Sequence, residues 1–238
     1  MTPLIKWPGG KSGEIRQVHS LIPPHKRYVE PFLGGGAMFF HLRPERAAVN
    51  DISTDLIGFY RLVRAQDENL RRWLMLYDAG FQGVLQAGSG ESEALTALFA
   101  AALAEEDPSA LADEVARRVV VSLPGAVLEE LVTDPARFEA HLSRALADKA
   151  KRTAAHHRKR PFSREDLREN LLTGLTGGCY LYFRSLFNDL SLGRLHRDEA
   201  YRAANFYFIR EYCYGSMFRY NAAARSAQLF INGGGREQ

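Results

Sequence analysis

The pattern of apolar and polar positions divides the chain of 238 residues into three stretches. In the first, short apolar runs alternate with glycine-rich turns. Tyr28–Val29–Glu30 predicts a short buried strand that leads straight into a glycine loop. We expect a helix over residues 37–42, a second strand over 47–51, and a further helix opening at 53–60 with Ser53 as its N-cap. Strand, loop, helix, strand and helix in this order are typical of a parallel α/β unit.

The middle stretch, from about residue 68 to 170, is rich in Ala, Leu, Glu and Arg. Its pattern predicts several helices separated by breakers such as Asp107–Pro108 and Asp134–Pro135. Ser109 and Thr133 are candidate N-caps of two of these helices. We therefore expect a helical insert in or beside the α/β part.

The last stretch, residues 177–221, is dense in aromatic residues with arginines interleaved. Aromatic side chains at this density predict a buried core. The interleaved arginines add weight to a role in nucleic-acid binding.

Composition changes this picture little, since the chain is 46% hydrophobic and 25% charged, as ordinary globular proteins are. No apolar run reaches about 18 residues, and the N-terminus lacks the apolar segment of a signal peptide, so a cytoplasmic protein is expected. The two cysteines, Cys179 and Cys213, make neither a disulfide framework nor a zinc pattern, and no metal site is expected.

Positive charge is concentrated in residues 149–160, which hold six Lys or Arg, two His and no acidic residue. A block of this kind is typical of a segment that contacts phosphates. A solvated linker explains the same charge equally well, so both interpretations stay open.

The strongest candidate site is the loop Glu30–Ala37, with three consecutive glycines after the first predicted strand. Glycines there allow a close approach of the backbone to a ligand, and the next helix offers its free N–H groups. Asp51 stands at the predicted end of the second strand, where an acid can accept hydrogen bonds from ribose hydroxyls. Together these features indicate a nucleoside cofactor, although the loop lacks the spaced glycines of a dinucleotide-binding turn.

Gly10–Lys11–Ser12 has the ending of a nucleotide-binding P-loop. That pattern requires a glycine at position 5, where this chain has Ile5, and no strand of useful length precedes it. An ATPase is therefore excluded.

In this order, the segments Lys6–Lys11, Tyr28–Ala37 and Asn50–Ile52 resemble the Dam-like (D12 class) family of N6-adenine DNA methyltransferases. The segments 182–188 and 206–221 are similar to later parts of the same family, whereas residues 68–170 match only in being helical. The resemblance implies an α/β fold, namely a partial Rossmann-like methyltransferase fold with an inserted or adjacent helical DNA-recognition domain. Residues 1–67 would be the part that binds S-adenosylmethionine, and residues 68–238 the mainly helical insert and DNA-recognition region.

The resemblance also implies roles for individual residues. Trp7, Gly10 and Lys11 would line the S-adenosylmethionine pocket, and its floor would comprise Glu30, Phe32, Gly34 and Gly36. Asp51 would hold the ribose, and Ile52 would pack on the adenine ring of the cofactor. The partner would be double-stranded DNA, contacted by Lys6 near the target base and by a hairpin that begins at Arg219, Tyr220 and Asn221.

The acceptor site of this family is missing from the sequence. N6 methylation requires a flipped-out adenine, held by an acid and a backbone carbonyl and stacked on an aromatic ring. In the family an Asp-Pro-Pro-Tyr motif supplies these groups, and no such motif occurs here. We therefore expect a C-terminally truncated or diverged relative whose catalytic residues are unknown, with the acceptor motif supplied by a second chain.

Three alternatives stay open at this stage. One is a catalytically inactive or split DNA-binding relative. Another is a small-molecule methyltransferase, which the glycine loop and Asp51 alone would permit but which Lys6 and the basic block at 149–160 disfavour. The third is an unstable remnant that lacks half of its sheet.

Overall fold

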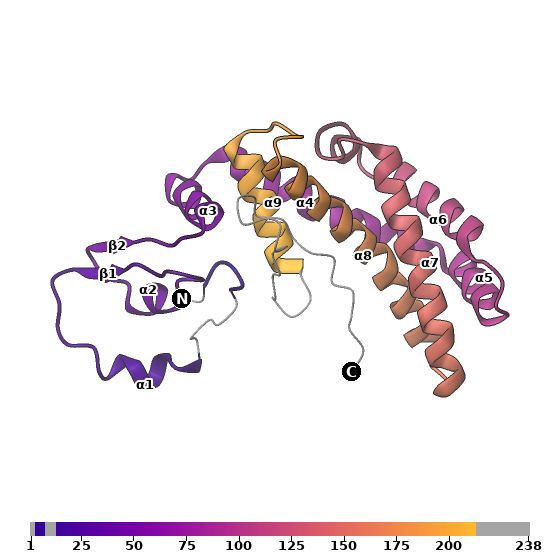
Figure 1. The fold of residues 1–238 in the computed structure, drawn as a ribbon, viewed down its shortest axis with the longest axis horizontal. Coiled ribbons are helices and arrows are strands. Elements are labelled where there is room, and N and C mark those ends of the chain that lie inside the picture. Colours follow the sequence, from indigo (N-terminus) through magenta and orange to yellow (C-terminus); the bar gives the residue numbers. More distant parts are fainter. Residues whose placement is uncertain (1–2, 8–12, 213–238) are drawn as a thin grey trace. The chain divides into compact units, whose positions relative to one another are not determined.

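The structure, a computed structural model, describes residues 3–7 and 13–212. Their contacts form two compact units (Figure 1). Unit 1 comprises Met1–Trp73 and Phe187–Gln238, and unit 2 comprises Leu74–Leu186. The functional division expected at residues 67 and 68 stays a prediction, but the structure groups the aromatic residues after 187 with the N-terminal segment.

Unit 1 begins with an α/β segment in the order that the sequence predicts. Its elements are α1 (Ile15–His19), β1 (Tyr28–Glu30), α2 (Ala37–Leu42), β2 (Ala47–Val49) and α3 (Thr54–Ala65). Strands β1 and β2 pair in parallel, with Tyr28 opposite Ala47. The predicted N-cap Ser53 is confirmed, because its Oγ accepts a hydrogen bond from a backbone N–H of the first turn of α3 at 3.3 Å.

The expectation of a buried first strand is wrong. Val29, in the middle of β1, is 61% exposed. A parallel strand is buried when both faces of its sheet are covered, and among the described residues the sheet has only two strands. A Rossmann-like sheet is therefore not seen in the part of the chain that the structure describes.

The core of unit 1 joins α3 to α9 (Glu199–Tyr212), which pack side by side. The rings of Phe59 and Tyr207 stack at 5.1 Å between centroids. Beside them, Arg202 Nε donates to Asp55 Oδ1 at 2.6 Å. The predicted aromatic core is confirmed here, since buried side chains include Phe187, Tyr201, Phe206 and Phe208.

Unit 2 is helical, as predicted. Its elements are α4 (Glu68–Gly90, which starts in unit 1), α5 (Ser92–Leu103), α6 (Ser109–Val121), the π-helical turn η2 (Val127–Leu131), α7 (Pro135–Lys159) and α8 (Arg164–Ser191, which ends in unit 1). Helix α7 packs against α5 and α6. Helix α8 approaches α7 so closely that a Cβ on Gly178 would lie 2.6 Å from the carbonyl oxygen of His141.

Both N-caps predicted in unit 2 are wrong. Ser109 is the first residue of α6, and its hydroxyl donates to the Asp107 carboxylate instead. Helix α7 is capped by Asp134, whose Oδ1 accepts from the Arg137 N–H at 2.9 Å, whereas the Thr133 hydroxyl lies 3.2 Å from that of Tyr182. In Asp–Pro the proline suits the first helical position, so the residue before it becomes the cap.

The basic block 149–160 is the C-terminal part of α7 and not a linker. Ala150 and Ala154 within it are fully buried. Lys151 Nζ lies 3.0 Å from Asp107 Oδ1, and Arg158 donates to the Leu103 carbonyl oxygen at 2.8 Å. Two side chains of the basic block therefore already make an ion pair or a hydrogen bond within unit 2. The predicted contact of this block with phosphates stays a prediction. Among the described helices, none is both long and apolar enough to cross a membrane.

Candidate functional site

The glycine loop after β1 has a backbone that only glycine adopts readily. Gly34 and Gly36 have φ angles of +53° and +74°. A Cβ on Gly36 would lie 2.9 Å from the ring of Phe40, so the loop also passes close to α2. The Leu33 N–H donates to the Asn50 carbonyl oxygen at 2.9 Å, which ties the loop to the segment after β2.

Asp51 lies against this loop, so the structure brings together two parts of the predicted site. Its Oδ2 accepts from the Gly34 N–H at 2.9 Å, and its Oδ1 accepts from the Ser53 N–H at 3.0 Å. Each carboxylate oxygen has a second lone pair, so the group can accept further hydrogen bonds from a ligand. Asp51 therefore fixes the shape of the loop and keeps capacity for a hydroxyl donor.

Trp7 also packs on Gly34. A Cβ on Gly34 would lie 2.9 Å from Cδ1 of the indole. The guanidinium of Arg210, on α9, stands 4.3 Å from the centroid of this ring and donates to the Lys6 carbonyl oxygen at 2.7 and 3.1 Å. Arg210 is only 2% exposed. No local sequence pattern signals this contact, because Arg210 and Lys6 are 204 positions apart.

Lys6 is joined to the same end of α9. Its ammonium lies 3.2 Å from Glu211 Oε2 and donates to the Glu211 carbonyl oxygen at 2.9 Å, and its backbone N–H donates to Glu211 Oε1 at 3.0 Å. The Lys6 side chain is still 56% exposed. Its predicted contact with DNA stays a prediction.

Glu30 ends β1 and carries an unusual carboxylate. Its Oε2 is buried and makes no hydrogen bond within the described residues. Burial raises the pKa of this carboxyl, although hydrogen bonds from the Tyr28 side chain and the Phe39 backbone oppose the shift. Tyr60 donates to the Gly35 carbonyl oxygen at 2.9 Å, and its pKa is raised by burial and by the charge of Glu30. A buried acceptor without a partner is a place where a donor group of a ligand would be stabilised.

Two large apolar side chains near the loop are almost fully exposed. Phe32 is 82% exposed and Ile52 is 91% exposed. Both were predicted to contact the cofactor, and apolar side chains this exposed often mark a binding surface. The other predicted site residues, Gly10, Lys11, Arg219, Tyr220 and Asn221, lie outside the described residues. No cluster of His, Cys, Asp or Glu in the described part of the chain could hold a metal ion.

Comparison with known proteins shows which family the N-terminal part of the chain resembles. Residues 7–82 match the family of D12 class N6 adenine-specific DNA methyltransferases. The resemblance expected from the motifs is confirmed over this segment. It includes Trp7, the glycine loop and Asp51, which are the parts that the structure brings together. No solved structure matches the chain.

The individual relatives match over short segments. A type II methyltransferase, M1.LlaDCHI of Lactococcus lactis subsp. cremoris, is 39% identical over 29% of this chain and 25% of its own length. The DNA N-6-adenine-methyltransferase of Escherichia phage P1 is 39% identical over 28% of this chain and 9% of its own length. A DNA adenine methylase of Vibrio cholerae is 33% identical over 30% of this chain and 27% of its own length. The chain thus spans about a quarter or less of the relatives that it matches.

Proposed function

We propose that unit 1 binds S-adenosylmethionine and that the chain takes part in methyl transfer to N6 of adenine in DNA. The observation that carries this proposal is the bond between Asp51 and the Gly34 N–H, within a segment that matches the methyltransferase family. The glycine loop, the acid after β2 and the indole of Trp7 together form a cradle for a nucleoside. The short β1–β2 pair would then belong to a Rossmann-like sheet.

The residues present fit this cofactor. Asp51 would accept hydrogen bonds from the ribose hydroxyls. The unpartnered Oε2 of Glu30 would accept from the amino group of the methionine part. Phe32 and Ile52 would lose their exposure against the adenine ring. Gly10 and Lys11 would complete the pocket from the segment next to Trp7. When bound, S-adenosylmethionine supplies an activated methyl group.

DNA would be contacted by Lys6 and by Arg219, Tyr220 and Asn221. The acceptor adenine would leave the duplex to reach the methyl donor. Since the Asp-Pro-Pro-Tyr motif does not occur in these 238 residues, the groups that hold the adenine would come from outside them, and a second chain is the source that we propose to test. The same observation favours a second candidate function, that of an inactive or split DNA-binding relative.

The cofactor site is tested by calorimetric titration of the chain with S-adenosylmethionine. Asp51→Asn removes a charged acceptor and weakens the tie to the loop, so we expect the dissociation constant to rise by about tenfold or more. Asp78→Asn is the matched control, because Asp78 is an exposed acid on α4 and should leave binding unchanged. Absence of binding by the unaltered chain, or equal binding by the two variants, would overturn the cofactor site.

Transfer itself is tested with radiolabelled methyl donor and mixed-sequence duplex DNA. We expect little transfer by the chain alone and recovery when a chain that carries the acceptor motif is added. Cofactor binding together with no transfer under either condition would favour the inactive relative. Robust adenine methylation by the purified chain alone would contradict the need for a second chain.

A further inference from the structure

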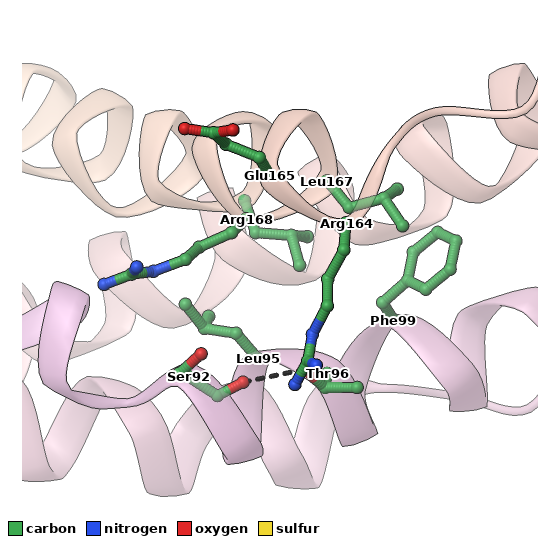
Figure 2. A pocket seen from close by; sticks show the side chains of 9 residues that line it. Ser92, Leu95, Thr96, Phe99, Arg164, Glu165, Leu167 and Arg168 are labelled. Atoms are coloured by element: carbon green, nitrogen blue, oxygen red, sulfur yellow. Dashed lines mark hydrogen bonds between the residues drawn. The ribbon is translucent and has the colours of Figure 1, made fainter.

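Unit 2 contains a cavity of about 460 Å³ between the start of α5 and the start of α8 (Figure 2). Its base is apolar, since Leu95, Phe99 and Leu171 are buried there. Its rim is polar and includes Ser92 and Thr96 from α5. The cavity lies outside the segment 7–82 that matches the methyltransferase family, so the family match gives it no role.

Two arginines from α8 frame this cavity. Arg164 and Arg168 are four residues apart and thus lie on one face of the helix. Figure 2 shows that the Arg164 side chain reaches across toward Thr96 and that Arg168 extends along the cavity. Arg168 Nη2 donates to the Ser89 carbonyl oxygen at 2.8 Å, which holds its guanidinium beside the junction of α4 and α5.

The start of α5 adds to the positive potential of this region. Its N-cap residue, Glu91, makes no side-chain capping bond within the described chain, and its carboxylate lies 3.5 Å from Arg118 Nε instead. The first turn of α5, from which Ser92 lines the cavity, therefore has no side-chain cap, and the positive end of the helix dipole lies at this end of the cavity.

Acidic groups near the cavity offset this charge only in part. The Glu165 carboxylate points away from the two guanidinium groups (Figure 2). The Asp166 carboxylate accepts a hydrogen bond from the Ser163 hydroxyl at 2.8 Å, and Ser163 Oγ caps α8 by accepting from the Asp166 N–H at 3.1 Å. Glu93, in the first turn of α5, is exposed. The polar groups that line the cavity are therefore mainly donors and cations.

We propose that this cavity binds the sugar–phosphate backbone of DNA. The guanidinium groups of Arg164 and Arg168, which lie apart in Figure 2, donate charge-assisted hydrogen bonds to the phosphate oxygens of neighbouring nucleotides, and a deoxyribose packs on the apolar base around Leu95. This inference rests on the proposed DNA substrate and adds a contact from unit 2. It is separate from the DNA contacts expected of Lys6 and Arg219–Asn221.

The test is the salt dependence of duplex binding by the full chain, measured by fluorescence anisotropy. Arg164→Gln combined with Arg168→Gln should weaken binding by about tenfold and lower the slope of log affinity against log salt by about one to two. The matched control combines Arg71→Gln with Arg117→Gln, which removes the same charge from two exposed surface ion pairs and should change the slope far less. Circular dichroism melts would show that both variants are folded.

Loss of the hydrogen bond between Arg168 and Ser89 could by itself disturb the fold of the double variant. A variant at Arg164 alone avoids this problem. Arg164→Gln leaves that bond intact and should still weaken binding more than Arg117→Gln alone. Equal slopes for the cavity variants and their controls, with duplex binding intact, would overturn this site and leave the proposed function standing. Failure of the unaltered chain to bind duplex DNA would overturn both.

A second experiment distinguishes binding of DNA from binding of a free nucleotide or free phosphate. Thymidine 5′-monophosphate and inorganic phosphate are titrated into the unaltered chain and the double variant. Weak or absent binding of both is expected, because a single phosphate loses the neighbouring contacts of the duplex. Tight binding of the mononucleotide that the double variant abolishes, with duplex binding unchanged, would instead assign the cavity to a free nucleotide.

Discussion

The two units use opposite means to hold their shape. In unit 2 long helices share a continuous apolar core, in which Phe138, Leu142 and Leu146 of α7 are fully buried. In the α/β segment of unit 1, the three-residue strands β1 and β2 and the short helices α1 and α2 accompany a loop that is held by individual hydrogen bonds. Unit 2 is therefore stabilised mainly by packing, and the glycine-loop region by a few specific contacts.

The contrast between the packed core of unit 2 and the glycine-loop region of unit 1 indicates where a ligand can bind. Exposed Phe32 and Ile52 and the unpartnered Oε2 of Glu30 are unfavourable in a free protein, and a ligand that covered them would remove this cost. We expect substitutions in the packed core of unit 2 to change stability and substitutions around the loop to change cofactor binding, and the following experiments test that division.

The largest effect is expected at the crossing of α7 and α8. Gly178→Ala introduces a Cβ 2.6 Å from the His141 carbonyl oxygen and 2.7 Å from Leu142 Cα, so the helices must separate. We expect unit 2 to lose about 2 kcal/mol, even though alanine favours helix formation. Urea unfolding followed by circular dichroism measures this loss.

The neighbouring glycine is the control. Gly177 lies one residue earlier in the same helix, and a Cβ there would meet nothing within 4 Å. Gly177→Ala should therefore stabilise the helix, by about 0.5–1 kcal/mol. Effects of the same sign and size at both positions would mean that backbone entropy, and not the close helix crossing, explains the role of Gly178.

A smaller effect on stability and a larger one on binding are expected at Arg210. Arg210→Met leaves the Lys6 carbonyl oxygen without its two donors and removes the cation beside the Trp7 ring. We expect unit 1 to lose about 1 kcal/mol and affinity for S-adenosylmethionine to fall, since Trp7 packs on Gly34. Thermal melts and calorimetric titration measure the two quantities separately.

Two further variants identify Arg210 as a positioning residue. Arg210→Lys keeps a charged donor for the Lys6 carbonyl oxygen and should restore part of the cofactor affinity. Arg197→Met removes a cation 5.3 Å from the Tyr201 ring at an exposed position and should leave cofactor binding unchanged. A fall in stability at Arg210 without any change in cofactor affinity would contradict the positioning role.

The sequence predicted what local chemistry determines. The strand positions, the helix over Ala37–Leu42 and the cap at Ser53 follow from turn residues and short-range hydrogen bonds, and the structure has them. The proximity of Asp51 to the loop followed from the parallel order of the strands, because consecutive parallel strands place their carboxyl ends together.

The features that the sequence missed depend on distant parts of the chain. Arg210 reaches Lys6 across 204 positions, and no local pattern marks either residue as a partner. The exposure of Val29 depends on what covers the strand, which a run of three residues does not encode. The cap at Asp134 is different, because it does follow from a local rule: the Asp–Pro pair is a stronger capping signal than the neighbouring Thr133.

The smallest effect, and the sharpest test of the division between stability and binding, is the pH dependence at Glu30. Burial raises the pKa of its carboxyl, so the native state holds this proton more tightly than the unfolded chain does. Stability from this group is therefore complete below the ordinary carboxyl pKa of about 4.3 and is lost as the pH rises through the raised value. Glu30→Gln stays neutral, so its stability relative to the unaltered chain should rise as the pH increases above the ordinary carboxyl pKa, by less than about 1 kcal/mol for a half-buried group.

The affinity of Glu30→Gln for S-adenosylmethionine should fall, although its stability rises. An amide in place of the Glu30 carboxylate gives a weaker acceptor for the amino group of S-adenosylmethionine, so Glu30→Gln should bind it less tightly at neutral pH. Glu45→Gln is the control, because Glu45 is an exposed carboxylate between α2 and β2 and should change neither quantity. A variant at Glu30 that is more stable at neutral pH yet binds more weakly would show that the buried carboxylate is retained for the ligand. A stability difference that does not vary with pH would instead mean that its charge is already satisfied in the free protein.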